Sequence, residues 1–143
     1  GEMRKNAEGP GWLDTFRFAV SETKRRLNYE LLVIDSLGAL ELISNFTRPR
    51  EDMFRLFEWL RSLEITTIIV SEMPVGPFTA YGSHDADFLA DGIIHLRMVE
   101  DNESEVHRRI RCVKMRENDH ATCHFSFFKK DATFYVTRAI SYF

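Results

Sequence analysis

Apolar residues recur three or four positions apart in three stretches of the first half of the chain, with charged residues between them. The pattern rests on Leu13, Phe16, Val20, Thr23 and Leu27, then on Leu37, Leu40 and Ile43, and then on Met53, Phe54, Phe57 and Leu60. This spacing puts apolar side chains on one face of an α-helix, so it predicts three helices. Pro49 precedes the third, where a first helical turn tolerates proline.

Two short apolar runs between and after these helices predict β-strands. They are "ELLVIDS" at residues 30–36 and "ITTIIVSE" at residues 65–72. Neither run alternates with polar residues, so we expect strands that are buried on both faces. Helices that alternate with such strands predict a parallel sheet with right-handed crossovers.

After residue 91 the pattern changes to successive strands. The segments are "GIIHLRMVE", "VHRRIRCVKM", "TCHFSFF" and "TFYVTRA", joined by the polar turns "DNESE", "RENDH" and "KKDA". The fold class that we predict is therefore α/β, with parallel strands flanked by helices first and an antiparallel β extension second. Residues 1–12 are expected to form a flexible lead-in and residues 13–143 a single domain.

Composition and charge narrow the class of protein. Hydrophobic residues make up 44% of the chain and charged residues 29%, which is typical of a globular protein. The net charge of -3 argues against a broad nucleic-acid-binding surface, although it allows a local basic patch. No apolar run reaches the roughly 20 residues of a membrane span, and no signal-peptide pattern opens the sequence. We expect a cytoplasmic protein with no membrane partner.

The two cysteines, Cys112 and Cys123, would face each other if residues 107–128 form a hairpin. A disulfide is then conceivable, but a cytoplasmic setting favours free thiols. His120 and His124 raise the alternative of a zinc site. Their spacing matches no standard zinc signature, and strand alternation sends Cys123 and His124 to opposite faces. We expect ordinary buried or surface side chains here.

Acidic residues end both predicted parallel strands: Asp35, followed by Ser36, and Glu72. Ligands of open α/β sheets bind beyond the carboxyl ends of the strands. An aspartate after an apolar strand is also how nucleotide-hydrolysing folds place a carboxylate near the magnesium that bridges phosphates. The alternative is that Asp35 merely caps the helix that follows.

The predicted strand at residues 106–115 ends by presenting two cations. Lys114 and Arg116 are two positions apart and so share a face, and His120 lies just past the bend. One explanation is a solvated sheet edge. The other is a site for a polyphosphate, because a guanidinium makes planar bidentate contacts and a lysine supplies a compact charge.

Four segments, taken in order and spacing, resemble the KaiC-like branch of the RecA superfamily of ATPases. They are "LLVIDSLGALE", "TTIIVSE", "DADFLADGIIHL" and "RRIRCVKMRENDHATCHFSF", and the likeness covers roughly residues 13–138. The most distinctive part is Lys-x-Arg followed by a histidine, which Lys114, Arg116 and His120 match. The resemblance implies a RecA-like P-loop NTPase core.

The resemblance also implies roles for these residues. "VIDS" becomes the Walker B strand, with Asp35 as the magnesium-associated catalytic carboxylate and its neighbour Ser36 as a nucleotide-binding residue. Lys114 and Arg116 become catalytic groups that reach across a subunit boundary to the phosphates of ATP, as an arginine finger does, with His120 beside the same nucleotide. We add Glu72 as a nucleotide-binding candidate. The implied cofactors are ATP and Mg²⁺, and the implied partners are neighbouring copies in a ring or an intact relative, in a signalling or regulatory role.

The sequence departs from the family in its first part. A P-loop needs Gly-x-x-x-x-Gly-Lys-Ser/Thr, and none of the seven glycines is followed by lysine. The strand that carries the family's catalytic glutamate is also missing, so the chain resembles the second half of a KaiC-like domain. We expect this chain alone to bind ATP very weakly and to hydrolyse none. An open strand edge should also favour dimers or larger assemblies.

Two other functions remain open at this point. The chain could be a non-catalytic interaction module that docks onto an intact ATPase and lends it Lys114 and Arg116. It could also be a paralogue of the DNA-repair type, since "HRRIRCVKMR" is strongly basic. Its cations, Arg108, Arg109, Arg111, Lys114 and Arg116, alternate across both faces of the strand and do not form one stripe, and the net charge is negative. We therefore expect DNA to be an unlikely partner.

Overall fold

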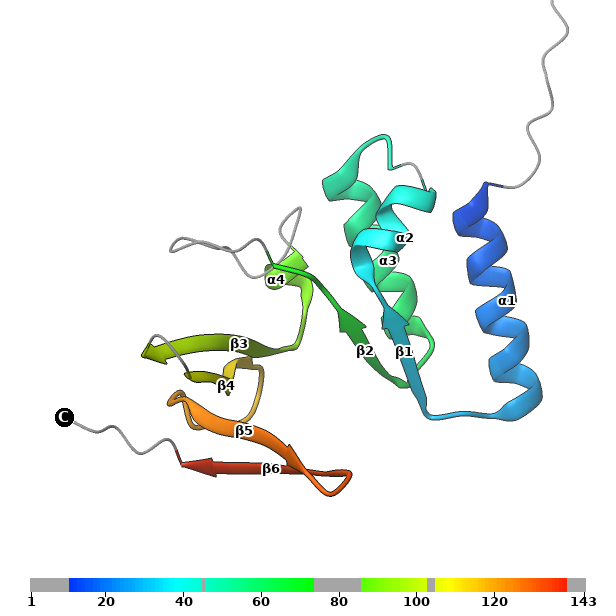
Figure 1. The fold of residues 1–143 in the computed structure, drawn as a ribbon. Helices are drawn as coiled ribbons and strands as arrows, with labels where there is room; N and C mark the ends of the chain where they lie inside the picture. Colours follow the sequence, from blue (N-terminus) through cyan, green and yellow to red (C-terminus); the bar gives the residue numbers. More distant parts are fainter. Residues whose placement is uncertain (1–10, 45, 74–85, 103–104, 139–143) are drawn as a thin grey trace, which may run out of the picture. The chain divides into compact units, whose positions relative to one another are not determined.

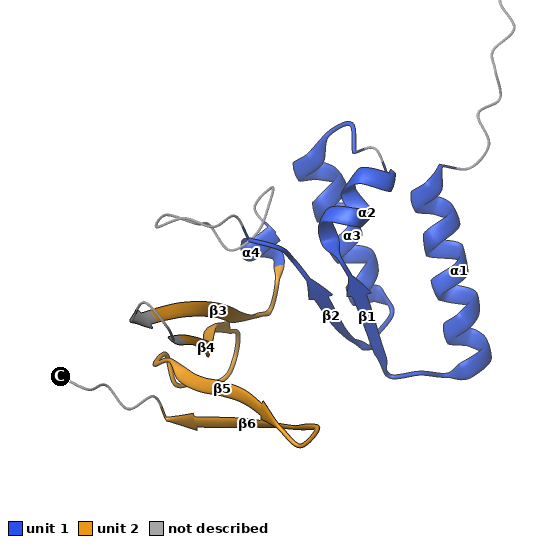
Figure 2. Cartoon of the chain, viewed as in Figure 1, with its two compact units in different colours: residues 1–89 blue, residues 90–143 orange. Residues whose placement is uncertain are grey.

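The computed structural model describes residues 11–44, 46–73, 86–102 and 105–138. The chain divides into two compact units, unit 1 at residues 1–89 and unit 2 at residues 90–143 (Figure 2). Most of the predicted lead-in, residues 1–10, lies outside the described residues. Helices and parallel strands occupy unit 1, and antiparallel strands occupy unit 2.

Unit 1 contains the helices and parallel strands that the sequence predicts (Figure 1). Its elements are α1 (Trp12–Leu27), β1 (Leu31–Asp35), α2 (Leu37–Ser44), α3 (Pro49–Ser62), β2 (Thr66–Val70) and α4 (Ala86–Leu89). The two strands pair in parallel, with Asp35 opposite Val70 at the last position of the ladder. Pro49 begins α3 as predicted.

The core of unit 1 lies between its helices and one face of β1 and β2. The buried side chains are Val20, Ile34, Leu37, Leu40, Met53, Leu56, Leu60, Leu63 and Ala86. In α3 the buried stripe runs through Met53, Leu56 and Leu60, whereas Phe54 is 52% exposed. Placing Phe54 on the apolar face was wrong, because it is rotated about 100° from Met53 and Leu56 continues the stripe instead.

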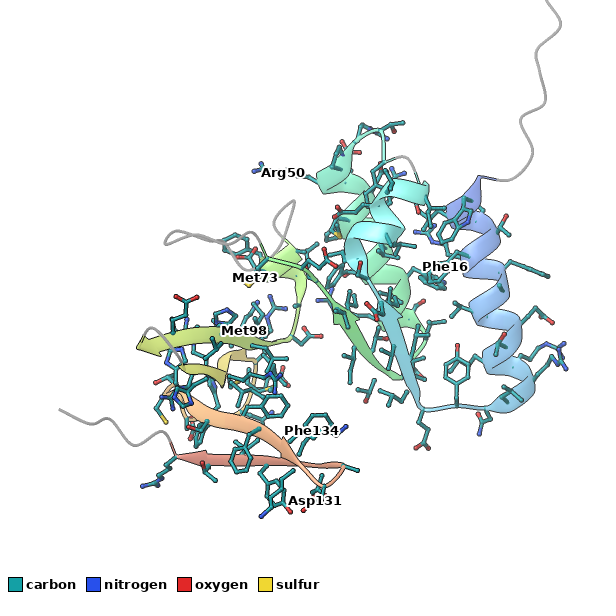
Figure 3. The ribbon with its side chains drawn as sticks, viewed as in Figure 1. Phe16, Arg50, Met73, Met98, Asp131 and Phe134 are labelled. Atoms are coloured by element: carbon teal, nitrogen blue, oxygen red, sulfur yellow. The ribbon has the colours of Figure 1, made fainter. Side chains whose placement is uncertain are left out.

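Aromatic contacts join α1 to α3 at one edge of this core. Phe16, labelled in Figure 3, extends from α1, and its ring centroid lies 5.8 Å from that of Trp59 in an edge-on arrangement. Trp12 stacks on Phe16 at 5.4 Å. Such pairs stabilise a helix contact by about 0.5–1.5 kcal/mol beyond the apolar area that they bury.

The two parallel strands are covered on one face only. Ile34 is buried and Leu32 and Ile69 pack against the core, whereas the side chains of Leu31 and Val33 are about half exposed. The expectation of strands buried on both faces is therefore wrong for the described residues. Helices of unit 1 pack on the Ile34 side, and the alternation of strand side chains sends the other residues outward.

Unit 2 is a four-stranded antiparallel sheet in the order of the sequence (Figure 1). Its strands are β3 (Gly92–Asn102), β4 (Glu105–Met115), β5 (Phe125–Lys130) and β6 (Thr133–Arg138). Strands β5 and β6 are joined through Asp131 and Ala132, whose φ angles of 47° and 65° suit a two-residue hairpin. The segment predicted to begin a strand at residue 122 joins the ladder only at Phe125.

A register shift interrupts the pairing of β3 with β4. Ile93 lies opposite Lys114, whereas the next residue, Ile94, lies opposite Cys112. Val113 is the extra residue on β4, as in a β-bulge. Because paired residues of an antiparallel sheet share a face, the bulge decides on which side of the sheet Lys114 lies.

Candidate functional site

The structure brings the candidate residues together in two groups, one in each unit. Asp35, Ser36 and Glu72 lie at one edge of the parallel strands in unit 1. Lys114, Arg116 and His120 lie at the end of β4 and in the segment that follows it in unit 2. The first group lies at the carboxyl ends of two paired strands, and the second lies at and just after the end of one strand. The two groups are described in turn below.

Ser36, and not Asp35, caps helix α2. The Ser36 hydroxyl oxygen accepts a hydrogen bond from the Ala39 N–H at 3.3 Å, and its carbonyl accepts one from the Leu40 N–H at 3.1 Å. This is the geometry of an N-cap. The alternative in which Asp35 serves only as the cap is therefore not needed to explain the start of α2.

Asp35 is the last residue of β1 and its side chain is exposed. Within the described part of the chain, no hydrogen bond or ion pair holds its carboxylate. Glu72, which is also exposed, follows β2 two residues after Val70, the ladder partner of Asp35. Two carboxylates thus stand beyond the carboxyl ends of neighbouring parallel strands, where α/β sheets bind ligands.

Arg116 is held at its backbone while much of its side chain remains exposed. Its N–H donates a 2.8 Å hydrogen bond to the carbonyl of Asp91, which precedes β3. Its guanidinium Nη1 also lies 3.2 Å from Asp91 Oδ1, and the two side chains are 49% and 66% exposed. Arg116 is therefore positioned from β3, but its charged end is accessible to solvent and to an anion.

Lys114 is half-buried near the end of β4, opposite Ile93. Arg116 lies just past the strand, opposite Asp91 through their backbone hydrogen bond. Both positions fall on the same side of the sheet, as the sequence predicts for residues two apart. The structure thus places both cations at the end of β4.

His120 follows the turn and is half-buried. Its Nδ1 atom lies 3.4 Å from the carbonyl oxygen of Asn118, while its Nε2 atom is buried and has no hydrogen-bond partner among the described residues. A buried imidazole nitrogen without a partner keeps an unused capacity for hydrogen bonding. The segment from Arg116 to His120 is held locally, since the Asn118 amide donates to the Arg116 carbonyl at 3.3 Å.

Sequence reasoning missed Asp91 and a set of basic residues on β3. Burial lowers the pKa of His95, and the nearby Arg111 and Arg97 lower it further. Burial is also the largest cause of the lowered pKa of His124, followed by the charges of Arg97, Arg111, His95 and Arg109. His95 and Arg97 come close to Arg111 and Arg109 because β3 pairs with β4 in this register. The sequence of a single strand does not show that register.

The cysteines and histidines of unit 2 form no cross-link or ligand cluster within the described residues. Cys112 and Cys123 are free thiols, and Cys112 Sγ donates to the Lys114 carbonyl at 3.3 Å. Among the described residues, no three His, Cys, Asp or Glu side chains gather closely enough to hold a metal ion. The helices within the described ranges are all too short or too polar to cross a membrane.

Comparison with known proteins points to one family. The sequence profile "ATPase: KaiC" matches residues 3–139. The circadian clock protein KaiC3 of Synechocystis is 32% identical over 111 residues, which are 76% of this chain and 21% of that protein. A circadian clock oscillator protein KaiC of Prochlorococcus marinus is 26% identical over 129 residues, or 88% of this chain and 24% of that protein.

The fold gives the same answer. The crystal structure of a KaiC-like protein from the archaeon Pyrococcus horikoshii matches 87% of this chain and 56% of its own, with a TM-score of 0.74 and 30% sequence identity. This likeness confirms the RecA-like α/β fold with an antiparallel extension. The chain spans about a fifth of the length of the two KaiC relatives.

Proposed function

The chain belongs to the KaiC family of ATPases, and on this premise we propose that it supplies part of an ATP site at a boundary between protomers. Unit 1 contributes the Walker B carboxylate, Asp35. Unit 2 contributes Lys114 and Arg116, which act in trans on the phosphates of a nucleotide held by the neighbour. The assembly hydrolyses ATP in a signalling or regulatory role.

The observation that carries this proposal is the state of Arg116. Its backbone is fixed by Asp91, and its guanidinium already lies against a carboxylate at 3.2 Å while about half of its side chain is exposed. A phosphate oxygen presents the same kind of charged acceptor as a carboxylate oxygen. The contact with Asp91 supports the proposal, because a guanidinium that binds a carboxylate here can bind a phosphate group in its place.

Lys114 and Arg116 have different roles at the phosphates. The planar guanidinium is suited to two parallel hydrogen bonds with the transferring phosphoryl group, and the ammonium of Lys114 neutralises charge as a compact ion. An arginine placed in this way stabilises the transition state and accelerates hydrolysis by about 10³–10⁵-fold in related nucleotide hydrolases. The buried Nε2 of His120 is available for a hydrogen bond to the same nucleotide.

Asp35 has the properties that a magnesium-associated carboxylate requires. It is exposed, it ends a parallel strand, and Ser36 relieves it of the capping role. Asp35 is the residue that would hold Mg²⁺ beside the nucleotide phosphates, and the ion would supply charge neutralisation there. Glu72 would add a second carboxylate at the carboxyl ends of the same strands.

Reconstitution tests this function. We expect the 143-residue chain alone to bind Mg-ATP very weakly and to hydrolyse none, because its sequence contains no P-loop motif to cradle the phosphates. Mixed with a polypeptide that carries the P-loop half of a KaiC domain, it should restore ATPase activity. Arg116→Ala should lower the rate of ATP hydrolysis by about 10³-fold or more. Arg108→Ala is the matched control, because Arg108 lies opposite Met98 on the other side of β4.

A second function fits the same accessible cations. In it, the chain is a non-catalytic module that docks onto an intact KaiC-type protomer and lends it Lys114 and Arg116. Activity that never appears with the P-loop half, together with saturable binding to an intact relative, would favour this module. A micromolar dissociation constant for Mg-ATP on the chain alone, measured by isothermal titration, would contradict both versions.

A further inference from the structure

The two cysteines of the chain lie at the two ends of the segment that carries the candidate phosphate contacts. Cys112 lies near the end of β4, Cys123 lies two residues before β5, and the sequence contains no other cysteine. Both are free thiols; Cys112 is half-buried and Cys123 is exposed. Lys114, Arg116 and His120 all fall between them. A bond between the two sulfur atoms would therefore enclose all three candidates in one ring.

The register of β4 with β5 directs the two thiols at each other. Ile110 lies opposite Phe125 at the last pair of the ladder, and each step forward along β4 corresponds to one step back along the partner segment. Two steps beyond this pair, the same register sets Cys112 opposite Cys123. Paired positions of an antiparallel sheet share a side and have Cβ atoms about 4.5–5.5 Å apart. A disulfide needs a Cβ separation only slightly shorter, about 3.5–4.5 Å.

The surroundings of His124 support the same register one step beyond the ladder. His124 is then the partner of Arg111, and it should lie on the side of Arg111 and His95, which face each other across β4 and β3. The charges of Arg111 and His95 both act on the imidazole of His124, as that placement requires. Alternation along the chain then directs Cys123 to the other side, which is also the side of Cys112.

The thiol of Cys112 contacts the strand end that carries the first of these candidates. Its Sγ donates a hydrogen bond to the carbonyl oxygen of Lys114 at 3.3 Å. A sulfur atom that has bonded to Cys123 carries no proton and can no longer donate. Oxidation therefore removes one contact that holds the backbone of Lys114, and the new bond holds the segment at a different point.

We propose that Cys112 and Cys123 form a reversible disulfide, a redox-sensitive link that closes the segment between them into a ring. The oxidant is a low-molecular-weight disulfide. The thiolate of the exposed Cys123 attacks one of its sulfur atoms, a mixed disulfide forms, and one small thiolate leaves. The Cys112 thiolate then attacks Cys123 Sγ and expels the second small thiolate. The protein loses two protons and two electrons, and the oxidant takes them up to become two small thiols.

The exposure of Cys123 favours a reversible bond over a permanent cross-link. Exposed disulfides have higher reduction potentials than well-buried structural ones and are typically labile or regulatory. Ile94, which lies opposite Cys112 on the same side of the sheet, is 65% exposed, so this side is open to solvent. Small thiols and disulfides can therefore reach the pair in both oxidation states.

Mass spectrometry of the 143-residue chain, incubated without denaturant in mixtures of oxidised and reduced glutathione, tests the proposal. We expect the oxidised product to be a monomer without a glutathione adduct and about 2 Da lighter than the reduced chain. Dithiothreitol should restore the original mass and the alkylation of both thiols. Cys112→Ser should stop at the glutathione adduct of Cys123, because no second thiol remains to expel the glutathione.

The matched control moves one thiol by one position. In the double variant Thr122→Cys with Cys123→Ser, alternation directs the new thiol away from Cys112, although the ring is one residue shorter. We expect ring closure at least about tenfold slower than in the parent chain. Closure as fast as in the parent would overturn the proposal, because the register would then have no part in it. Glutathione adducts on both thiols, or disulfide-linked dimers in place of the closed monomer, would also overturn it.

An effect on ATP turnover rests on the proposed function and has a test of its own. In the reconstituted assembly the oxidised chain should support ATP hydrolysis at least about tenfold more slowly than the reduced chain, since a displacement of about 1 Å can cost about 10²-fold in rate. Dithiothreitol should restore the rate, and an assembly with Cys123→Ser should not respond to oxidised glutathione.

The two measurements separate the disulfide from the proposed function. If the reduced chain restores no ATPase activity, the proposed function fails, while the mass measurement still decides whether Cys112 and Cys123 form the bond. If activity is restored and oxidation leaves it unchanged, the disulfide does not regulate the ATP site.

Discussion

Unit 1 and unit 2 of this chain differ in how far each encloses its own apolar residues. Unit 1 buries a continuous core around Met53 and Leu56, which are fully enclosed. Among the described side chains of unit 2 none is buried, and apolar side chains such as Leu96 and Met98 are mostly exposed. A sheet with this much exposed apolar surface gains little stability from a core of its own, so the difference indicates where partners should bind.

The largest expected effect distinguishes the two units by stability. Leu56→Ala removes a side chain from the enclosed core and should lower the free energy of unfolding by about 2–5 kcal/mol. Leu96→Ala removes the same atoms from an exposed strand position and should cost less than about 1 kcal/mol. Urea unfolding followed by circular dichroism measures both, and equal losses would contradict the comparison.

Self-association should depend on the exposed apolar side chains of β3 in unit 2, Leu96 and Met98. We expect the chain to form dimers or larger assemblies, and the pair Leu96→Lys with Met98→Lys should weaken that association about tenfold or more. Ile68→Lys, at a comparably exposed strand position of unit 1, is the matched control. Light scattering that finds a monomer at high concentration for the parent chain would contradict this expectation.

Removing the carboxylate that holds Arg116 should have a small effect on stability. Asp91→Asn keeps the shape and the backbone hydrogen bond but removes an exposed ion pair, which typically contributes about 0.2–1 kcal/mol. In the reconstituted assembly, the same change should alter ATP turnover far more than stability, because it removes a carboxylate that competes with the phosphates for the guanidinium. A loss of several kcal/mol of stability without any change in turnover would show that Asp91 has only a structural role.

The smallest effect concerns pH. Burial and the neighbouring arginines lower the pKa of His95 and His124 below the ordinary value of 6.5. The folded state therefore binds fewer protons than the unfolded state in that range, and the stability of unit 2 should fall as the pH drops below about 6.5. His124→Gln should flatten this dependence in thermal unfolding between about pH 7.5 and pH 5.5. A stability that rises on acidification would contradict the assignment.

The sequence predicted the order and type of the helices and strands better than it predicted which of their faces are covered and how the strands pair. Helical spacing located α1, α2 and α3, and the runs around Val33 and Ile68 located the parallel strands, because both signals are local. Which face of a strand is covered depends on what packs against it, and so the exposure of Val33 was not predictable. The bulge at Val113 arises from pairing between strands, which is why the side of the sheet on which Lys114 lies and the contact of Asp91 with Arg116 emerged only from the structure.

The central claim is that Lys114 and Arg116 contact the triphosphate held by a neighbouring protomer. A structure of the intact, nucleotide-loaded assembly tests it by measuring the distance from the Arg116 guanidinium to the γ-phosphate oxygens. We expect hydrogen-bond distances of about 2.7–3.2 Å, with the Lys114 ammonium also in contact with the phosphates. Both side chains directed into bulk solvent, away from the nucleotide, would contradict the claim.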